Sequence, residues 1–249
     1  MPHGRTRDGN RSPGWGGSAT EVALGGRISA KWITFGALAA LAGGAACRAG
    51  ELSVSIVDRA SRPVGEVVVT AAPVAAPVAP VAPTAAAAAR AVMDQRQLAF
   101  VPRVLVVAAG SSVDFPNNDT VSHQVYSFSP AKKFQLPLYK GAPHPPVTFE
   151  RPGLVVLGCN IHDEMVGYIY VTDAPYFGTT DAQGALHFAN LPAGDYRITV
   201  WSPLIADPAD SLQRTAHVTA PEAATLRVAL THNLRTRPEP RPRRGDWEY

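Results

Sequence analysis

The sequence has very little cysteine: Cys47 and Cys159 are the only two among 249 residues. Cys47 lies in a segment with the features of a secretory signal, because Arg27 and Lys31 precede or begin a short apolar run over 32–46 that is rich in Ala, Leu and Gly. This run is too short for a comfortable transmembrane helix. We therefore predict that residues 1–49 are a signal peptide, that the protein is exported to the periplasm, and that cleavage leaves no membrane span.

Loss of this leader excludes a disulfide within the mature chain, because Cys159 is then its only cysteine. A single thiol in an oxidising compartment is a liability unless it is buried or bound to a metal. Cys159 is followed by His162 and Met165 in a Cys-x2-His-x2-Met pattern. Thiolate, imidazole and thioether ligands together favour copper over zinc or a hard cation. A buried, inert cysteine is the alternative, and the neighbouring His162 and Met165 favour the metal ligand.

The predicted mature chain also has no large excess of basic or acidic residues. Residues 1–49 hold six basic and two acidic residues, whereas residues 50–249 hold seventeen basic and eighteen acidic ones. Nucleic-acid binding needs a clustered basic face, so we predict no nucleic-acid partner. The one basic cluster places arginines among prolines in residues 232–249, which we predict to be a disordered tail. Docking of this tail to an acidic partner is the alternative.

The common catalytic motifs are absent as well. The chain contains no Gly-x-Ser-x-Gly, no P-loop and no His-Glu-x-x-His sequence. A multicopper oxidase would need additional histidine-rich motifs, and the sequence has none. We therefore predict that the protein is not an enzyme.

Helical periodicity is scarce, and this favours an all-β fold. Short valine-rich runs are interrupted repeatedly by Gly, Pro, Asn and Asp, which is typical of β-strands and turns. Residues 50–72 are predicted to form a β-hairpin. Residues 73–92 form an Ala/Pro-rich tract that favours polyproline II and is predicted to be a linker.

A second histidine, His123, follows an Asn/Asp-rich segment at 117–120. Two histidines, one cysteine and a weak axial methionine are the ligands of a blue-copper electron-transfer site. The sequence therefore predicts one type 1 copper ion, bound by His123, Cys159 and His162 in a plane and by Met165 along the axis. Four further histidines after residue 49 lie in no such motif and are predicted not to be ligands: His144, His187, His217 and His232.

Residues 97–172 resemble cupredoxins of the plastocyanin, amicyanin and pseudoazurin kind, and also plastocyanin-like proteins associated with methylamine utilisation. The resemblance rests on Phe100-x-Pro102, Gly110, Val113-Asp114-Phe115, the segment before His123, and Cys159-x2-His162-x2-Met165. It implies a Greek-key cupredoxin β-sandwich over residues 93–175, with His162 as the ligand that reaches the surface and passes the electron. The chain departs from the usual neighbours of these ligands at Gln124, Asn160 and Ile161, so we predict no value for the redox potential.

Residues 180–188 and 191–200 resemble carboxypeptidase-regulatory-like, prealbumin-type β-domains. This resemblance implies a smaller β-sandwich over residues 176–231, without peptidase activity. Such domains usually begin with strands like those in 51–72. Our hypothesis is therefore that 51–72 and 176–231 form one discontinuous sandwich into which the cupredoxin domain is inserted. The alternative adds 51–72 to the cupredoxin domain.

Taken together, the sequence predicts a periplasmic type 1 copper protein that carries single electrons between redox proteins. The expected partners are a donor and an acceptor, such as a periplasmic dehydrogenase and a cytochrome. Two other functions stay open at this point. One is copper binding and delivery with the same ligands, and the other is an envelope binding module whose copper site is secondary.

Overall fold

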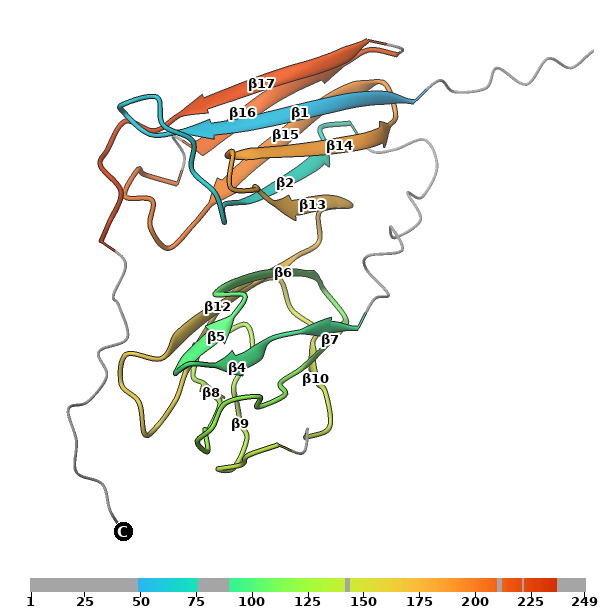
Figure 1. The fold of residues 1–249 in the computed structure, drawn as a ribbon. Coiled ribbons are helices and arrows are strands. Elements are labelled where there is room, and N and C mark those ends of the chain that lie inside the picture. The colour runs from blue at the N-terminus through green and yellow to red at the C-terminus, as the bar shows by residue number, and fades with distance from the viewer. Residues whose placement is uncertain (1–48, 76–89, 142–143, 210–211, 221, 237–249) are drawn as a thin grey trace, which may run out of the picture. The chain divides into compact units, whose positions relative to one another are not determined.

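The structure is a computed structural model that describes residues 49–75, 90–141, 144–209, 212–220 and 222–236 (Figure 1). The regular elements in these residues are β-strands, which confirms the predicted all-β class. Within the same residues there is no helix long and apolar enough to cross a membrane. The predicted signal peptide, most of the predicted linker and the end of the predicted tail lie outside the described residues.

Strands from both ends of the chain form one β-sandwich, which we call the terminal sandwich. Its members are β1 (Gly50–Val57), β2 (Val68–Pro73), β13 (Tyr176–Thr179), β14 (Ala185–Leu191), β15 (Gly194–Trp201), β16 (Gln213–Val218) and β17 (Ala223–Ala229). One sheet has the order β14-β1-β17 and the other has the order β13-β2-β15-β16. β1 pairs antiparallel with β14 and parallel with β17, while β2 lies between β13 and β15. This is the strand pairing that the inserted-domain hypothesis requires.

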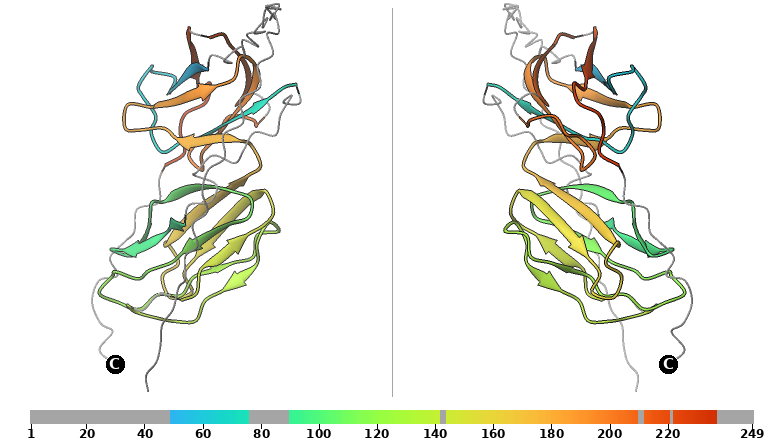
Figure 2. Two further views of the ribbon diagram at one scale, coloured as in Figure 1. Left: turned by 90° about the vertical axis from the view of Figure 1, so that its right-hand side faces the viewer. Right: turned by 90° about the vertical axis from the view of Figure 1, so that its left-hand side faces the viewer.

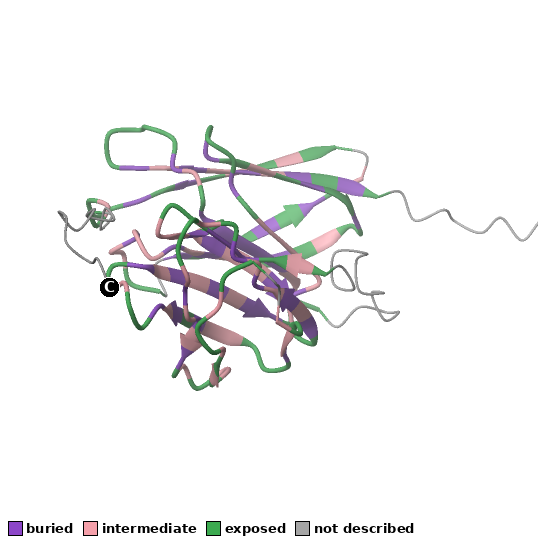
Figure 3. Ribbon diagram, turned by 60° about the horizontal axis from the view of Figure 1, so that its bottom comes forward, coloured by how far each residue is buried: buried purple, intermediate pink, exposed green. Residues whose placement is uncertain are grey.

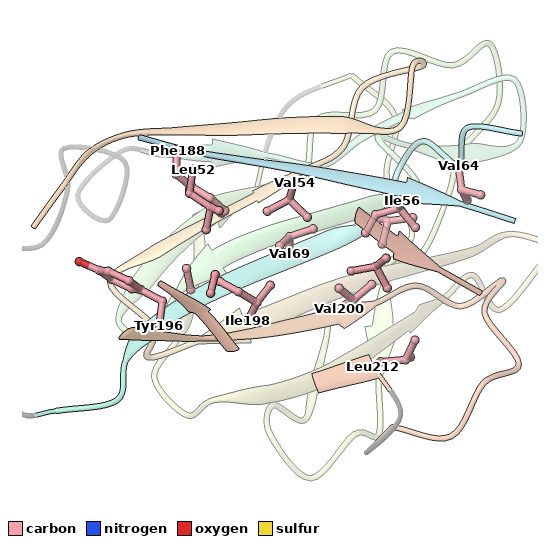
Figure 4. Packing of buried hydrophobic residues seen from close by; sticks show 14 of the residues in the cluster. Leu52, Val54, Ile56, Val64, Val69, Phe188, Tyr196, Ile198, Val200 and Leu212 are labelled. Carbon is pink, nitrogen blue, oxygen red and sulfur yellow. The ribbon is translucent and has the colours of Figure 1, made fainter. Parts of the chain in front are cut away.

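Alternation along β1 explains its place in the terminal sandwich. Leu52, Val54 and Ile56 are fully buried, while the serines between them point to the other face of the sheet. The buried side chains meet Val69 of β2 and Ile198 of β15 across the core (Figure 4). Figure 3 shows the same alternation of buried and more exposed positions along the strands.

The predicted hairpin over 50–72 is wrong. β1 and β2 belong to opposite sheets of the terminal sandwich and share no ladder. Each strand has an apolar face, and packing these faces against each other buries more apolar surface than pairing the strands edge to edge. Residues 58–67 therefore cross from one sheet to the other.

The predicted disordered tail begins too early. Leu234 packs against the terminal core. The Arg235 amide donates a hydrogen bond to the Leu204 carbonyl at 2.7 Å, and the His232 amide donates one to Asp207 Oδ2 at 3.2 Å. Apolar burial and paired backbone groups thus hold residues 232–235 on the sandwich, and residues 237–249 lie outside the described part.

The remaining strands form the central sandwich. They are β3 (Ala91–Val92), β4 (Asp94–Arg96), β5 (Ala99–Val101), β6 (Val104–Ala108), β7 (Ser111–Asp114), β8 (Tyr126–Ser127), β9 (Phe134–Gln135), β10 (Val147–Phe149), β11 (Gly153–Gly158) and β12 (Val166–Thr172). Their sheets have the orders β10-β7-β3, β6-β12-β11-β8-β9 and β4-β5. Figure 2 shows β11 and β12, in yellow, side by side. Because β3 pairs with β7, the sandwich begins before the predicted boundary at residue 93.

The core of the central sandwich extends to the predicted metal ligands. Cys159 and Met165 belong to the same buried apolar cluster as Met93, Phe115 and Phe149. A rigid, closely packed core therefore lies directly beneath the predicted site.

We predict that Leu52→Ala lowers the free energy of unfolding by about 2–5 kcal/mol, because it leaves a cavity in the terminal core. The matched control is Ser55→Ala on the other face of the same strand, with an expected change within about 0.5 kcal/mol. Chemical denaturation of the whole protein measures both. Equal losses from the two variants would contradict the observed register of β1.

Candidate metal centre

His123 is fixed by its backbone as well as by its ring. Its amide donates a hydrogen bond to the Tyr139 carbonyl and its carbonyl accepts one from the Tyr139 amide, both at 3.0 Å. The preceding segment is tied down by Asn117, whose Nδ2 donates to the carbonyls of Val121 at 3.0 Å and Tyr139 at 2.8 Å. Asn117 Oδ1 accepts the Asp119 amide at 3.0 Å, which forms a local side-chain turn. The Asn/Asp-rich sequence therefore places His123 through its own side chains.

The other predicted ligands come from one loop. Cys159 directly follows β11, and Met165 directly precedes β12. These two strands pair from Gly153↔Val171 to Gly158↔Val166, so their ladder closes the loop at its base. Within the loop, the Met165 amide donates to the His162 carbonyl at 2.9 Å.

The structure brings three of the four predicted ligands together. His123 Nδ1 lies 3.1 Å from His162 Nδ1, and Cys159 Sγ lies 3.8 Å from the first nitrogen and 3.6 Å from the second. The centre of a triangle with these sides lies about 2 Å from each corner, which is close to the length of a bond from zinc or a similar metal ion to imidazole or thiolate. The three donor atoms therefore fit a single metal ion.

The site is buried on one side and open on the other. The His123 side chain has no exposed surface, Cys159 is 3 % exposed, and His162 is half-buried. Met165 is 1 % exposed and lies in the same apolar cluster as Cys159. This burial agrees with a ligand inside the core, and the axial position of Met165 stays a prediction.

The surroundings favour the thiolate form of Cys159. Burial alone would raise its pKa, but hydrogen bonds from His123 and from the amides of Gln124, Ile161 and His162 lower the pKa below its ordinary value. Burial likewise opposes protonation of His123, whereas its hydrogen bonds to Cys159 and Asp119 raise the pKa of its ring. A thiolate is the form of cysteine that binds a metal ion.

Sequence reasoning missed one residue of the site, Asp119. Its Oδ2 lies 2.9 Å from His123 Nε2, the ring nitrogen on the far side from the donor cluster. The available signal was a carboxylate four residues before a predicted ligand, within the same turn. That signal is weak, because Asp is common in turns for local reasons.

The other histidines have different partners. His187 contacts Ser53 and Glu51, His217 Nδ1 lies 2.7 Å from Asp195 Oδ1, and His232 lies near Asp207. His144 stacks edge-on against Tyr139, with ring centroids 4.6 Å apart. Among the described residues, the donor cluster consists of His123, Cys159 and His162.

Comparison with known proteins returned structural similarities alone. No protein-family model matches the chain, and no curated protein matches it. A purple cupredoxin from Nitrosopumilus maritimus is 23% identical, with a TM-score of 0.30, over 33% of this chain and 99% of that one. A copper-containing nitrite reductase, NirK, from Thermus scotoductus is 26% identical, with a TM-score of 0.32, over 40% of this chain and 25% of that one. An oxidised amicyanin variant is 23% identical, with a TM-score of 0.31, over 33% of this chain and 82% of that one.

Tyr139 supports His123 from within the core. Its hydroxyl donates a hydrogen bond to the Phe115 carbonyl and accepts one from Gln95 Nε2, both at 2.5 Å. Burial, with a further contribution from nearby Asp94 and Cys159, raises the pKa of Tyr139 to about 12 although the Gln95 hydrogen bond opposes the shift. The neutral hydroxyl is therefore part of the folded structure.

We predict that Tyr139→Phe lowers the free energy of unfolding by about 1–3 kcal/mol, because it removes the hydroxyl that donates to the buried Phe115 carbonyl and leaves that carbonyl with only the longer hydrogen bond from Gln95 Nε2 at 3.4 Å. Because folding raises the pKa of Tyr139, the stability advantage of the wild type over Tyr139→Phe is complete below a pH of about 10. It shrinks as the pH rises towards about 12, where the folded tyrosine ionises. Denaturation at several pH values measures this difference. Tyr126→Phe on β8 is the control, and a Tyr139→Phe effect no larger than that of the control would contradict the prediction.

Proposed function

We propose that this protein binds one type 1 copper ion and carries single electrons between redox proteins in the periplasm. The observation that supports this proposal is the triangle of two imidazole nitrogens and one cysteine sulfur, with sides of 3.1, 3.6 and 3.8 Å. His123, Cys159 and His162 are the proposed strong ligands, and Met165 is the proposed weak axial ligand.

The donor set favours copper over zinc. Structural zinc sites are tetrahedral and have four strong nitrogen, sulfur or oxygen ligands. Here the cluster within the described residues has three strong donors, and the fourth proposed donor is a buried thioether. Two histidines and one cysteine with a long methionine bond are the pattern of blue-copper sites.

The rigidity of the site supports electron transfer. A one-electron carrier works best when the geometry of its metal site changes little between the two oxidation states, because little then has to reorganise. His123 is held by its backbone bridge to Tyr139, and the Cys159–Met165 loop is closed by the β11–β12 ladder. Ligands on such supports keep their positions better than ligands on free loops. The bound copper would supply the redox chemistry, and the protein would supply this fixed geometry.

The surface near His162 is the proposed place of electron exchange. His162 is more exposed than either of the other two strong donors. Its neighbours Ile161, Asp163 and Glu164 are also exposed. An apolar residue beside two carboxylates suits a partner with an apolar contact surface and a basic rim. A periplasmic dehydrogenase as donor and a cytochrome as acceptor would fit this role.

We predict that the purified protein takes up one equivalent of Cu(II) with an intense thiolate-to-copper absorption band and a narrow hyperfine splitting in its EPR spectrum. Cys159→Ser should abolish this band, because the hydroxyl cannot replace the thiolate as charge donor. The exposed histidine variant His187→Asn is the matched control and should retain the full band. A colourless wild-type protein, or one with an ordinary tetragonal Cu(II) spectrum, would refute the proposed function.

We predict that Met165→Leu retains the absorption band and raises the midpoint potential, because the axial ligand tunes the potential of such sites. Leucine has a similar volume, so the fold should lose less than about 1.5 kcal/mol of stability. Protein-film voltammetry measures the potential of both proteins. An unchanged potential would remove Met165 from the axial position.

A further inference from the structure

An apolar surface lies on the outer side of β8 and β11 in the central sandwich. Phe128, which follows β8, is 75 % exposed, the highest value among the exposed large apolar side chains of the described residues. Val156 of β11 is 40 % exposed, because the alternation along the strand turns it away from the core. Its amide donates a hydrogen bond to Ser129 Oγ at 2.9 Å, which holds the residue after Phe128 against β11. Neighbouring exposed apolar side chains of this kind are typical of interaction surfaces.

Tyr126 extends this surface along β11. The centroid of its ring lies 5.2 Å from that of Phe128, and the two rings are tilted by 44°. Tyr126 pairs with Gly158, and a methyl group at Gly158 would lie only 2.7 Å from Tyr126 Cζ. The ring therefore lies directly on the backbone of β11. Tyr126, Phe128 and Val156 thus form one surface, which we call the outer-face patch.

The surface beside the first residues of β11 is basic. Arg151 lies just before β11, and its Nη2 donates a hydrogen bond at 2.8 Å to the Pro130 carbonyl in the turn between β8 and β9. Lys133 lies in the same turn and is exposed. Lys132 Nζ is 3.7 Å from Glu150 Oε2, so these two charges oppose each other. The ion pairs between described residues include neither Lys133 nor Arg151. Two positive charges therefore border this end of the outer-face patch.

The loop that follows β11 is acidic. Asp163 and Glu164 are exposed in this loop, and its residues 159–165 include no lysine or arginine. β11 has six residues. At about 3.3 Å per residue, its two ends are roughly 17 Å apart. This separation is about twice the Debye length at physiological ionic strength. The basic and the acidic end therefore act as separate charges, with the apolar patch between them.

A surface that is basic at one end, apolar in the middle and acidic at the other end is complementary to itself. Two copies placed face to face in antiparallel orientation bring their apolar parts together. The basic end of each copy then faces the acidic end of the other. Most soluble homo-oligomers use a two-fold arrangement of this kind, in which both copies contribute the same surface. Residues 50–249 hold seventeen basic and eighteen acidic residues, so the net charges of two mature copies oppose their contact very little.

We propose that the outer-face patch is the contact surface of a two-fold homodimer, with Phe128 as its apolar anchor. A second copy is favoured over an unrelated partner because the chain itself carries both the basic and the acidic end that such a contact needs. The patch is small, so the dimer is expected to be weak and transient. Asp163 and Glu164 also border the proposed electron-exchange surface near His162. A dimer would therefore compete with a redox partner for these two carboxylates.

The first test measures the mass of the purified protein by sedimentation velocity from micromolar to millimolar concentration. The wild type should change from monomer to dimer as the concentration rises. Phe128→Ser should raise the dissociation constant of the dimer by about tenfold or more, because it removes the aromatic anchor. Phe128 is largely exposed, so this change should leave the fold intact. A wild type that stays monomeric throughout overturns the proposal and leaves the patch to a different protein or to a membrane surface.

The second test compares two substitutions of the same kind. Val156→Ser removes an apolar side chain from the outer-face patch, and Val92→Ser removes one from β3, which belongs to a different sheet of the central sandwich. The two valines have similar exposed fractions, 40 % and 46 %. Val156→Ser should weaken the dimer several-fold, whereas Val92→Ser should leave its dissociation constant unchanged. Equal effects of the two substitutions overturn the assignment of the contact to this face.

The third test exchanges the charges at the two ends of the patch. One variant combines Lys133→Glu with Arg151→Glu, and another combines Asp163→Lys with Glu164→Lys. Each should be monomeric, because both ends of its patch then carry the same sign. A variant with all four substitutions should dimerise again, because opposite charges face each other once more. Its failure to dimerise while circular dichroism shows the wild-type fold, or a wild-type affinity in either of the first two variants, overturns the antiparallel arrangement.

These tests separate the dimer from the proposed function. All three are made on protein without added metal, so their results do not depend on copper binding. The spectrum of the copper-loaded wild type tests the proposed function, and its failure leaves the dimer to be decided by sedimentation.

Discussion

The convergence of two imidazole nitrogens and one cysteine sulfur in a largely buried place is the constraint on which the central sandwich depends. Such donors repel or hydrogen-bond one another unless the backbone fixes their positions. Here the backbone fixes them from two directions. The β11–β12 ladder closes the Cys159–Met165 loop, and the backbone bridge between His123 and Tyr139 fixes the third donor. The core beneath includes Cys159 and Met165 themselves. Site and core are therefore one packed unit, and a change in either affects the other.

Hydrogen-bonded polar groups around the donor cluster complete this arrangement. Asn117 ties the segment before His123 to Val121 and Tyr139, and Asp119 holds the far side of the His123 ring. The buried hydroxyl of Tyr139 is hydrogen-bonded to Phe115 and Gln95. Buried polar groups are favourable only when they are satisfied, so this network favours a single arrangement of the site. The proposal of one-electron transfer therefore rests on fixed donor residues as well as on the types of donor.

The terminal sandwich differs from the central one, because its strands come from distant parts of the chain. β1 is buried between β14 and β17, and β2 between β13 and β15, so neither sheet is complete without the residues that precede the central sandwich. The apolar faces of β1 and β2 meet across the core, which is why they do not pair as a hairpin. Surface turns tolerate an insertion of this kind when the ends of the inserted segment lie close together.

The sequence by itself determined the all-β class, through short valine-rich runs and frequent turn residues. It also predicted the donor residues, through Cys159-x2-His162-x2-Met165 and the turn before His123. Ligand chemistry is local, so residue type and spacing were sufficient to make this prediction. Tertiary structure alone decided that β1 lies beside β14 and β17, that residues 232–235 pack on the sandwich, and that Asp119 reaches His123 Nε2. Each of these depends on which surfaces meet after the chain has folded back on itself. Hydrophobic alternation specifies that a strand has a buried face, but it does not specify the strand or sheet against which that face packs.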